Sequence, residues 1–217
     1  MKLIKILGVV ILLVLIFGKP IAWVQPMPIE EWPEEERVRY IRDKYVFYEL
    51  YAAYALSNED LSICQKSIDP QACIEHAEYL STIYNFAKGD CDQLKSEAKR
   101  ELCKGLNSGC RTIDNDCLKQ MCDAIKNKDI QKVVKVSGVP YWAFNLGIIG
   151  QEGAADLLAV YYGAKSNRIS TCLKYQDPNN LVRKAVCRIL FSSSFSSSDF
   201  SELVDDLIQQ YTKKEGF

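Results

Sequence analysis

Apolar residues recur at helical spacing near both ends of the chain, and no segment alternates convincingly with period two. A helix is predicted from Pro33 to about Leu56. Its apolar positions are Val38, Ile41, Tyr45, Tyr48, Ala52 and Ala55. A last amphipathic helix is predicted from Asp199 to Lys213, with Phe200, Leu203, Leu207 and Tyr211 on one face. The pattern predicts an all-α fold.

Between these two helices, capping residues divide the chain into short helices joined by tight turns. Asp69-Pro70 is predicted to begin a helix that stops at Gly89, and Asp177-Pro178 to begin another that runs to about Phe191. In both places the carboxylate would accept hydrogen bonds from the exposed backbone N–H groups, and proline fits the first helical turn.

The most apolar stretch after the N-terminal region spans residues 138–164. Three glycines interrupt it, and Glu152 and Asp156 lie within it. These features argue against a second membrane span and favour two helices that meet at a glycine-rich turn, where glycine permits close backbone approach.

The N-terminal region has the pattern of an export signal. Two lysines precede an unbroken apolar run of thirteen residues that ends at Gly18, which is short for a membrane span of about 20 residues. Residues 1–18 are therefore predicted to be a signal peptide or an uncleaved membrane anchor, and no good cleavage site decides between the two. Residues 19–32 read as a proline-rich linker, and residues 33–217 as a single helical domain.

The cysteine content agrees with export. The chain of 217 residues has nine cysteines and one histidine, and the first cysteine is Cys64. All nine would lie outside the cytoplasm, where disulfides form and persist. The predicted location is the cell surface or periplasm, or a membrane-anchored position facing outside. A formal net charge of −1 with no basic run gives no reason to expect a nucleic-acid partner.

Three cysteine-bounded segments share one arrangement, in which a cysteine ends one helix, an Asp begins the next, and a second cysteine lies inside that next helix. They are Cys64 to Cys73, Cys110 to Cys117, and Cys172 to Cys187. We interpret them as helix-turn-helix repeats stapled by disulfides.

The pairs Cys64–Cys73 and Cys172–Cys187 are predicted to be native disulfides, and Cys110–Cys117 is ranked slightly ahead of Cys103–Cys110. Cys91 and Cys103 lie in what reads as one helical stretch, and would be roughly 18 Å apart along it. They could pair only if that helix breaks. The odd number of cysteines leaves one thiol over.

The segment Cys91-x-x-Leu94-x5-Arg100-x-x-Cys103 resembles a repeat of exported, Cys-rich helical proteins from prokaryotes, often archaea, to which no activity is attached. The resemblance covers about 13 residues strictly and about 60 loosely. The Cys64 and Cys172 segments depart from its spacing. It implies helical repeats and nothing about activity.

Candidate chemistry is sparse. No C-x-x-C motif occurs, so neither a zinc site nor a thioredoxin-type site is indicated, and no metal or cofactor is predicted. His76 lies three residues after Cys73, but a disulfide beside a solvated surface histidine is the preferred interpretation of this spacing. The best carboxylate pair is Glu152 with Asp156, four residues apart in an apolar setting, which could serve acid–base hydrolysis or simply begin a helix.

The leading functional hypothesis is a non-enzymatic helical module, structural or protein-binding, that meets another protein of the cell envelope. The alternative is an extracytoplasmic hydrolase that uses carboxylates near Glu152 and Asp156. A third hypothesis, a lipid-binding module, requires an internal apolar cavity. A broad apolar patch would favour the first, and a pocket lined by carboxyl groups with raised pKa values would favour the second.

Overall fold

The computed structural model describes residues 31–137 and 150–216 of the chain. Every regular element in these two ranges is a helix, so the predicted all-α class is confirmed. The predicted signal or anchor at 1–18 and nearly all of the linker at 19–32 lie outside the described residues. The α-helices are α2 (Glu34–Lys44), α3 (Tyr48–Ser57), α4 (Pro70–Lys88), α5 (Glu97–Ser108), α6 (Asp116–Lys126), α7 (Ile130–Ser137), α8 (Gly150–Ser166), α9 (Ile169–Leu173), α10 (Leu181–Phe191) and α11 (Ser197–Glu215). Short 3-10 helices are η2 (Leu61–Lys66), η3 (Cys91–Gln93) and η4 (Cys110–Thr112).

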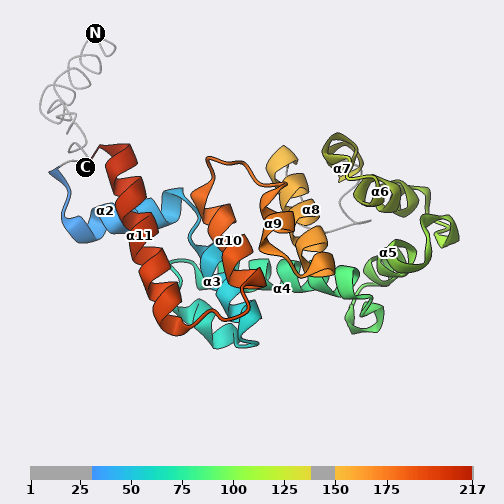
Figure 1. The fold of residues 1–217 in the computed structure, drawn as a ribbon, viewed down its shortest axis with the longest axis horizontal. Helices are drawn as coiled ribbons and strands as arrows, with labels where there is room; N and C mark the ends of the chain where they lie inside the picture. The colour runs from blue at the N-terminus through green and yellow to red at the C-terminus, as the bar shows by residue number, and fades with distance from the viewer. Residues whose placement is uncertain (1–30, 138–149, 217) are drawn as a thin grey trace, which may run out of the picture.

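Helix α4 is the central element of the molecule. It packs against α3 and α8 along its length and against α5 near its C-terminal end. In Figure 1, α4 connects the half of the molecule that holds α2, α3, α10 and α11 with the half that holds α5, α6 and α7. The buried apolar residues of both halves form one core cluster.

The helix predicted from Pro33 to Leu56 is broken in two, which corrects the prediction. Helix α2 ends at Lys44, and Val46 takes the left-handed conformation with φ 51° before α3 begins. The Phe47 N–H donates to the Arg42 carbonyl across this bend. The bend separates a helix with one buried residue from a helix buried on most sides, because each needs a different orientation to the core.

The two Asp-Pro pairs behave differently. Asp69 is the N-cap of α4, and its side chain accepts a hydrogen bond from the Ala72 N–H, as predicted. The same prediction is wrong for Asp177, which instead accepts from the Asn179 N–H within a turn. Asn180 caps α10 and accepts from the Arg183 N–H, so the helix begins at Leu181. An Asp-Pro pair opens a turn as readily as a helix, and here the later asparagine supplies the cap.

Four disulfides cross-link the described residues, and each joins a short turn-like helix to the α-helix that follows it. They are Cys64–Cys73, Cys91–Cys103, Cys110–Cys122 and Cys172–Cys187, with Cα–Cα distances of 5.5 to 5.7 Å. The first and last were predicted and are present.

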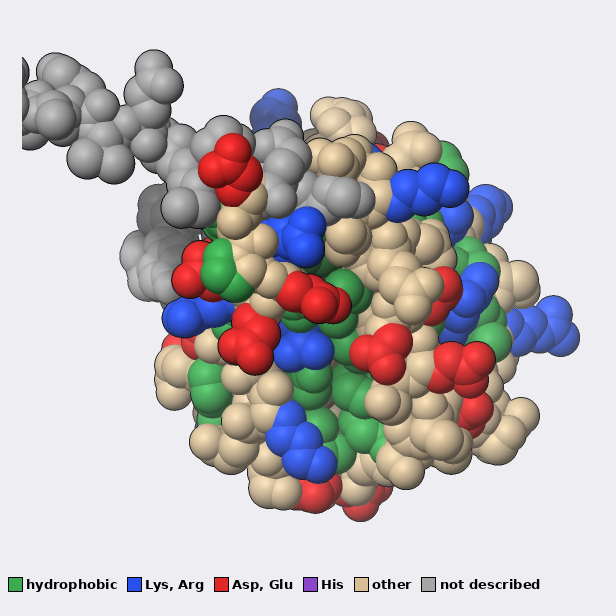
Figure 2. Space-filling view, turned by 90° about the vertical axis from the view of Figure 1, so that its left-hand side faces the viewer, with side chains coloured by type: hydrophobic (Ala, Val, Ile, Leu, Met, Phe, Trp, Pro, Cys, Tyr) green, Lys and Arg blue, Asp and Glu red, His purple; other side chains and the backbone are tan. Residues whose placement is uncertain are grey.

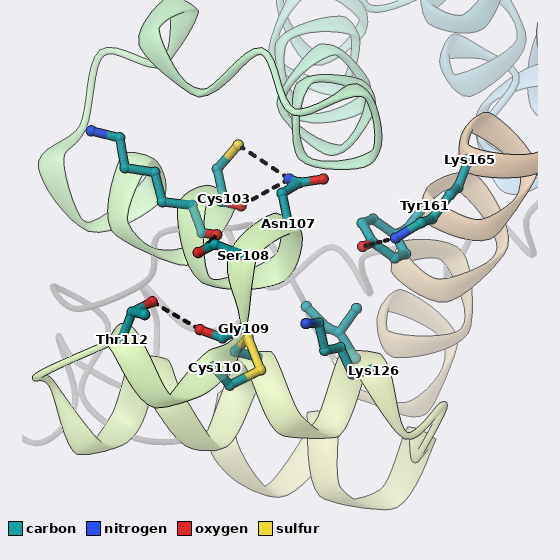
Figure 3. Close-up of a disulfide and its surroundings, with 12 residues drawn as sticks. Cys103, Asn107, Ser108, Gly109, Cys110, Thr112, Lys126, Tyr161 and Lys165 are labelled. Carbon is teal, nitrogen blue, oxygen red and sulfur yellow. Dashed lines mark hydrogen bonds between the residues drawn. A yellow bond between two sulfur atoms is a disulfide. The ribbon is translucent and has the colours of Figure 1, made fainter.

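The predicted pair Cys110–Cys117 is wrong, because Cys110 bonds to Cys122 and Cys117 is free. Helix α6 begins at Asp116, after an Asn115 cap, so Cys117 and Cys122 are five residues apart within one helix. Five residues rotate a side chain by about 140° around the axis. Cys122 therefore occupies the buried face, against the Cys110 turn, while Cys117 is only partly buried. Figure 3 shows this disulfide beside Gly109, whose carbonyl accepts from the Thr112 hydroxyl.

The stretch from Cys91 to Cys103 is broken, which lets its two cysteines pair. The 3-10 turn η3 ends at Gln93, Leu94 after it has an extended backbone, and α5 begins after Ser96. The Arg100 guanidinium donates to the carbonyls of Leu94 and Lys95 at 2.7 and 3.1 Å and holds the break in place.

The unit closed by Cys91–Cys103 and the unit closed by Cys110–Cys122 form a tandem repeat. In each unit the first cysteine is followed twelve residues later by the second. Buried apolar residues recur at matching places in both units: Leu94 and Ile113, Leu102 and Met121, and Leu106 and Ile125. Gly105 is needed for the packing between units, since a Cβ there would lie 2.3 Å from the Ile113 Cδ1 atom. One supersecondary unit is thus used twice in succession.

The cross-links predict a specific stability difference. Replacing both Cys91 and Cys103 by serine should lower the free energy of unfolding by about 3 kcal/mol, because the unfolded chain loses a closed loop. The matched variant Cys117→Ser, which removes no bond, should change it by less than about 1 kcal/mol. Denaturant unfolding of oxidised protein measures both, and an equal loss in the two variants would contradict the assigned pairing. Thiol counting on the oxidised, denatured chain should find one free thiol.

Candidate functional site

Arg183 joins three helices through carboxylates. It lies in the first turn of α10, positioned by the Asn180 cap and by the Cys172–Cys187 disulfide that ties α10 to α9. Its guanidinium is 3.8 Å from Glu49 of α3, 3.6 Å from Glu152 and 3.1 Å from Asp156 of α8. We call these four residues the Arg183 cluster.

The members of the cluster differ in exposure. Glu49 and Asp156 are buried, at 6% and 8% exposed, whereas the Glu152 side chain is 78% exposed. The Gln176 side-chain amide donates to the second oxygen of Asp156 at 2.8 Å. Asp156 thus has a close cation and a hydrogen-bond donor, while among the described residues the Glu49 carboxylate has only the more distant Arg183.

Burial determines the electrostatics of the two buried carboxyls. Loss of solvent raises the pKa of Glu49 to about 7, and the neighbouring Asp156 charge adds to this against the opposing effect of Arg183. Burial also raises the pKa of Asp156 to about 6, although Arg183 and Gln176 both oppose the shift. Desolvation outweighs the ion pairs here, as is usual for buried charges.

A histidine and two tyrosines lie next to the cluster. The His76 ring centroid is 5.9 Å from that of Tyr48 and 5.5 Å from that of Tyr79. Burial, with a contribution from the Arg183 charge, lowers the pKa of His76 to about 4. The imidazole is therefore neutral at neutral pH. The Tyr79 hydroxyl donates to the Gly153 carbonyl at 3.5 Å, which links α4 to α8.

The structure brings together the two carboxylates predicted from the sequence, but not the candidate metal ligands. Glu152 and Asp156 do converge, but on a shared arginine rather than on an open space between two carboxyls. His76 packs between tyrosines instead of lying on a solvated face. Cys73, three residues away, is bonded to Cys64 and has no thiol to offer a metal. In the ranges that the structure describes, no group of three or more His, Cys, Asp or Glu side chains is arranged to hold a metal ion.

Sequence reasoning missed Glu49, Arg183 and Gln176. One signal for Glu49 was present, since it is the only charged residue in the apolar window from Tyr45 to Leu56. A lone charge in a buried helix needs a partner elsewhere in the fold. No local pattern identifies Arg183 as that partner, because it lies 134 positions further along the chain.

Two cavities lie in grooves away from the Arg183 cluster. One of about 430 Å³ lies between α4 and the start of α5, and another of about 690 Å³ between α5 and the start of α6. Among large apolar side chains of the described residues, only Leu61 is exposed, at 49%. The apolar patch expected of a protein-binding surface is therefore small in this part of the chain.

No protein-family model, curated protein or solved structure matches the chain. None of the helices in residues 31–137 and 150–216 combines the length and the apolarity that crossing a bilayer requires.

Replacing Arg183 should reveal the free-energy cost of burying Glu49 and Asp156 without a cation. Arg183→Met leaves Glu49 and Asp156 buried without a cation and should lower the free energy of unfolding at pH 8 by about 3–5 kcal/mol. The loss should shrink at pH 5.5, where both carboxyls can bind a proton. Arg188→Met is the matched control, since Arg188 lies exposed on the same helix and should cost less than about 0.5 kcal/mol. Urea unfolding at both pH values measures the four differences, and a loss independent of pH would contradict the assignment.

The contributions of Glu49 and His76 to the free energy of unfolding should change with pH in opposite directions. The pKa of Glu49 is higher in the fold than its ordinary value of 4.5, so its contribution makes stability fall as pH rises from about 4.5 to 7. The pKa of His76 is lower in the fold than its ordinary value of 6.5, so its contribution makes stability fall as pH drops from about 6.5 to 4. Asp156 acts in the same direction as Glu49.

Glu49→Gln should therefore make the slope of stability against pH more positive between pH 4.5 and 6.5, and His76→Gln should make it more negative. Thermal unfolding at half-unit pH steps measures both slopes. Two variants with the slope of the unmodified chain would show that neither group is desolvated as the structure has it.

Proposed function

We propose that this chain is an exported, non-enzymatic helical module that binds another protein of the cell envelope. The observation that carries the proposal is the pair of tandem disulfide-linked units, Cys91–Cys103 and Cys110–Cys122, with a preformed groove between α5 of the first unit and the η4 segment that leads into α6 of the second. Stacked helical repeats commonly present such grooves to partners, and a groove held by covalent links loses little entropy when it binds.

The four disulfides are compatible with an oxidising, extracytoplasmic compartment. Export through residues 1–18, as a cleaved signal or as a retained anchor, is part of the proposal. A retained anchor would hold the module at the outer face of the membrane.

The groove between α5 and the start of α6 is the surface we assign to the partner. Charges of both signs line it, including Glu97, Arg100 and Lys104 of α5 and Asp114 beyond η4. Of these, Lys104 is exposed and forms no ion pair within the part of the chain that the structure describes. A polar groove of mixed charge selects a partner by complementary charge rather than by apolar area alone.

A second surface lies at the end of the molecule formed by α2 and α11. Figure 2 shows that acidic and basic side chains surround hydrophobic ones on this end. A cavity of about 420 Å³ lies there between α2 and α11, with Val38 and Ile208 among its lining residues. We rank it below the α5–α6 groove because no disulfide fixes its walls.

An extracytoplasmic hydrolase is the second candidate. The raised pKa of Asp156 favours it, because a carboxyl that titrates near neutral pH can act as a general acid. Against it, both Glu152 and Asp156 are paired with Arg183. A hydrolytic activity that Asp156→Asn abolishes in a folded chain would reverse this ranking.

The binding proposal predicts a crosslink at a defined place. A photoreactive residue at position 104 of the full chain, in native membranes, should give one adduct of discrete mass. The same residue at the exposed position 210 of α11 should give none. Glu97→Lys, two turns before Lys104 on the same α5 wall of the groove, should reduce the adduct severalfold by changing the groove charge. Equal labelling from positions 104 and 210, or no adduct from position 104, would overturn the proposed surface.

A further inference from the structure

The cavity of about 430 Å³ between α4 and the start of α5 has the size of a small-molecule site. Ala77 and Thr82 of α4 and Leu94 after η3 form part of its lining. Leu56 at the end of α3 and Leu61 of η2 complete its apolar side. Leu61 is the exposed large apolar residue noted above, so a ligand in this cavity would cover it.

Two disulfides fix the walls of this cavity. Cys64–Cys73 ties η2, which carries Leu61, to α4. Cys91–Cys103 ties η3, next to Leu94, to α5. The cavity is therefore preformed, and a ligand need not order the chain in order to bind.

The lining departs from the tandem repeat at the positions that face the cavity. Lys99 stands where the second unit has Leu118, which is buried. Ser96 makes no side-chain cap to α5, whereas the matching Asn115 caps α6 through the N–H groups of Cys117 and Leu118. A half-buried lysine in place of a core leucine is costly for folding alone, and such departures mark functional positions.

The charges around the cavity nearly balance. Within the described residues Lys99 forms no ion pair at 4 Å or less, although the charge of Glu78 acts on its ammonium. The Lys95 ammonium is 4.0 Å from Glu78, and both of these side chains are largely exposed. Glu59 also lines the cavity. Two lysines and two glutamates give no net attraction for a polyanion such as a nucleotide, but Lys99 remains a cation beside apolar walls.

We propose that this cavity binds a small amphipathic carboxylate of the fatty-acid type. The carboxylate would accept a hydrogen bond from the Lys99 ammonium, and the alkyl chain would lie against Leu56, Leu61 and Leu94. The inference goes beyond the proposed protein-binding function and does not depend on it, because it concerns a different groove.

Octanoate is the probe, titrated into the oxidised full chain by calorimetry. We expect saturable binding at one site, weakened about tenfold in both Lys99→Leu and Lys99→Gln through loss of the charged hydrogen bond. Lys99→Leu places the residue of the sister unit at this position and should keep the fold, which thermal unfolding checks. Lys126→Leu, at an exposed position at the end of α6, is the matched control and should bind octanoate like the unmodified chain.

Octyltrimethylammonium, which has the same chain and the opposite charge, should bind at least tenfold more weakly than octanoate. Equal affinity for the two probes, no saturable binding of octanoate, or unchanged affinity in both Lys99 variants would each overturn the proposal. None of these results would affect the crosslink expected from position 104, so the two proposals fail separately.

Discussion

Each of the four disulfides joins a helix to the short turn that precedes it, and the other features of the molecule depend on that link. Helices of eleven or twelve residues, such as α6 and α5, are marginal by themselves in water. A bond from the turn to the helix reduces the entropy of the unfolded chain and fixes the direction in which the helix leaves the turn. Short helices can then stack with grooves between them that keep their shape when empty. The groove between α4 and α5 and the groove between α5 and the start of α6 both have walls that these disulfides hold in place.

The Arg183 cluster presents the opposite energetic situation. Burying Glu49 and Asp156 costs more than their pairing with one arginine returns, as the raised pKa values of both carboxyls indicate. Such a cluster adds little net stability, yet it permits only one arrangement of α3, α8 and α10. Apolar contacts between these helices would tolerate sliding, whereas a guanidinium shared by carboxylates of two helices does not. We interpret the cluster as a device for specificity, and its neighbours His76 and Tyr79 extend it to α4.

Local patterns predicted the parts of the fold that local physics determines. The all-α class, the Asp69 cap and the Cys64–Cys73 link follow from residues close together in sequence. The same reasoning failed where two local solutions compete. Asp177 could cap a helix or open a turn, and Asn180 decided between them. Cys110 could reach Cys117 or Cys122, and the decision depended on where α6 begins, which Asn115 fixes.

The candidate site was harder to predict, because its partners lie far apart in the chain. Glu152 and Asp156 were identified from their spacing, but the arginine that they share comes from another helix, and Glu49 from a third. The tandem units are easier to interpret from local sequence. Comparing a position in one unit with the matching position in the other shows which residue type the fold itself requires there. A leucine at 118 and a cap at 115 define the structural solution for this unit. At the wall of the cavity, the first unit has Lys99 and Ser96 in place of the leucine and the capping residue. Each of these two residues stabilises α5 less than its counterpart stabilises α6. A position that departs from its own repeat, at a cost to folding and beside an open space, is most simply explained by what that space binds.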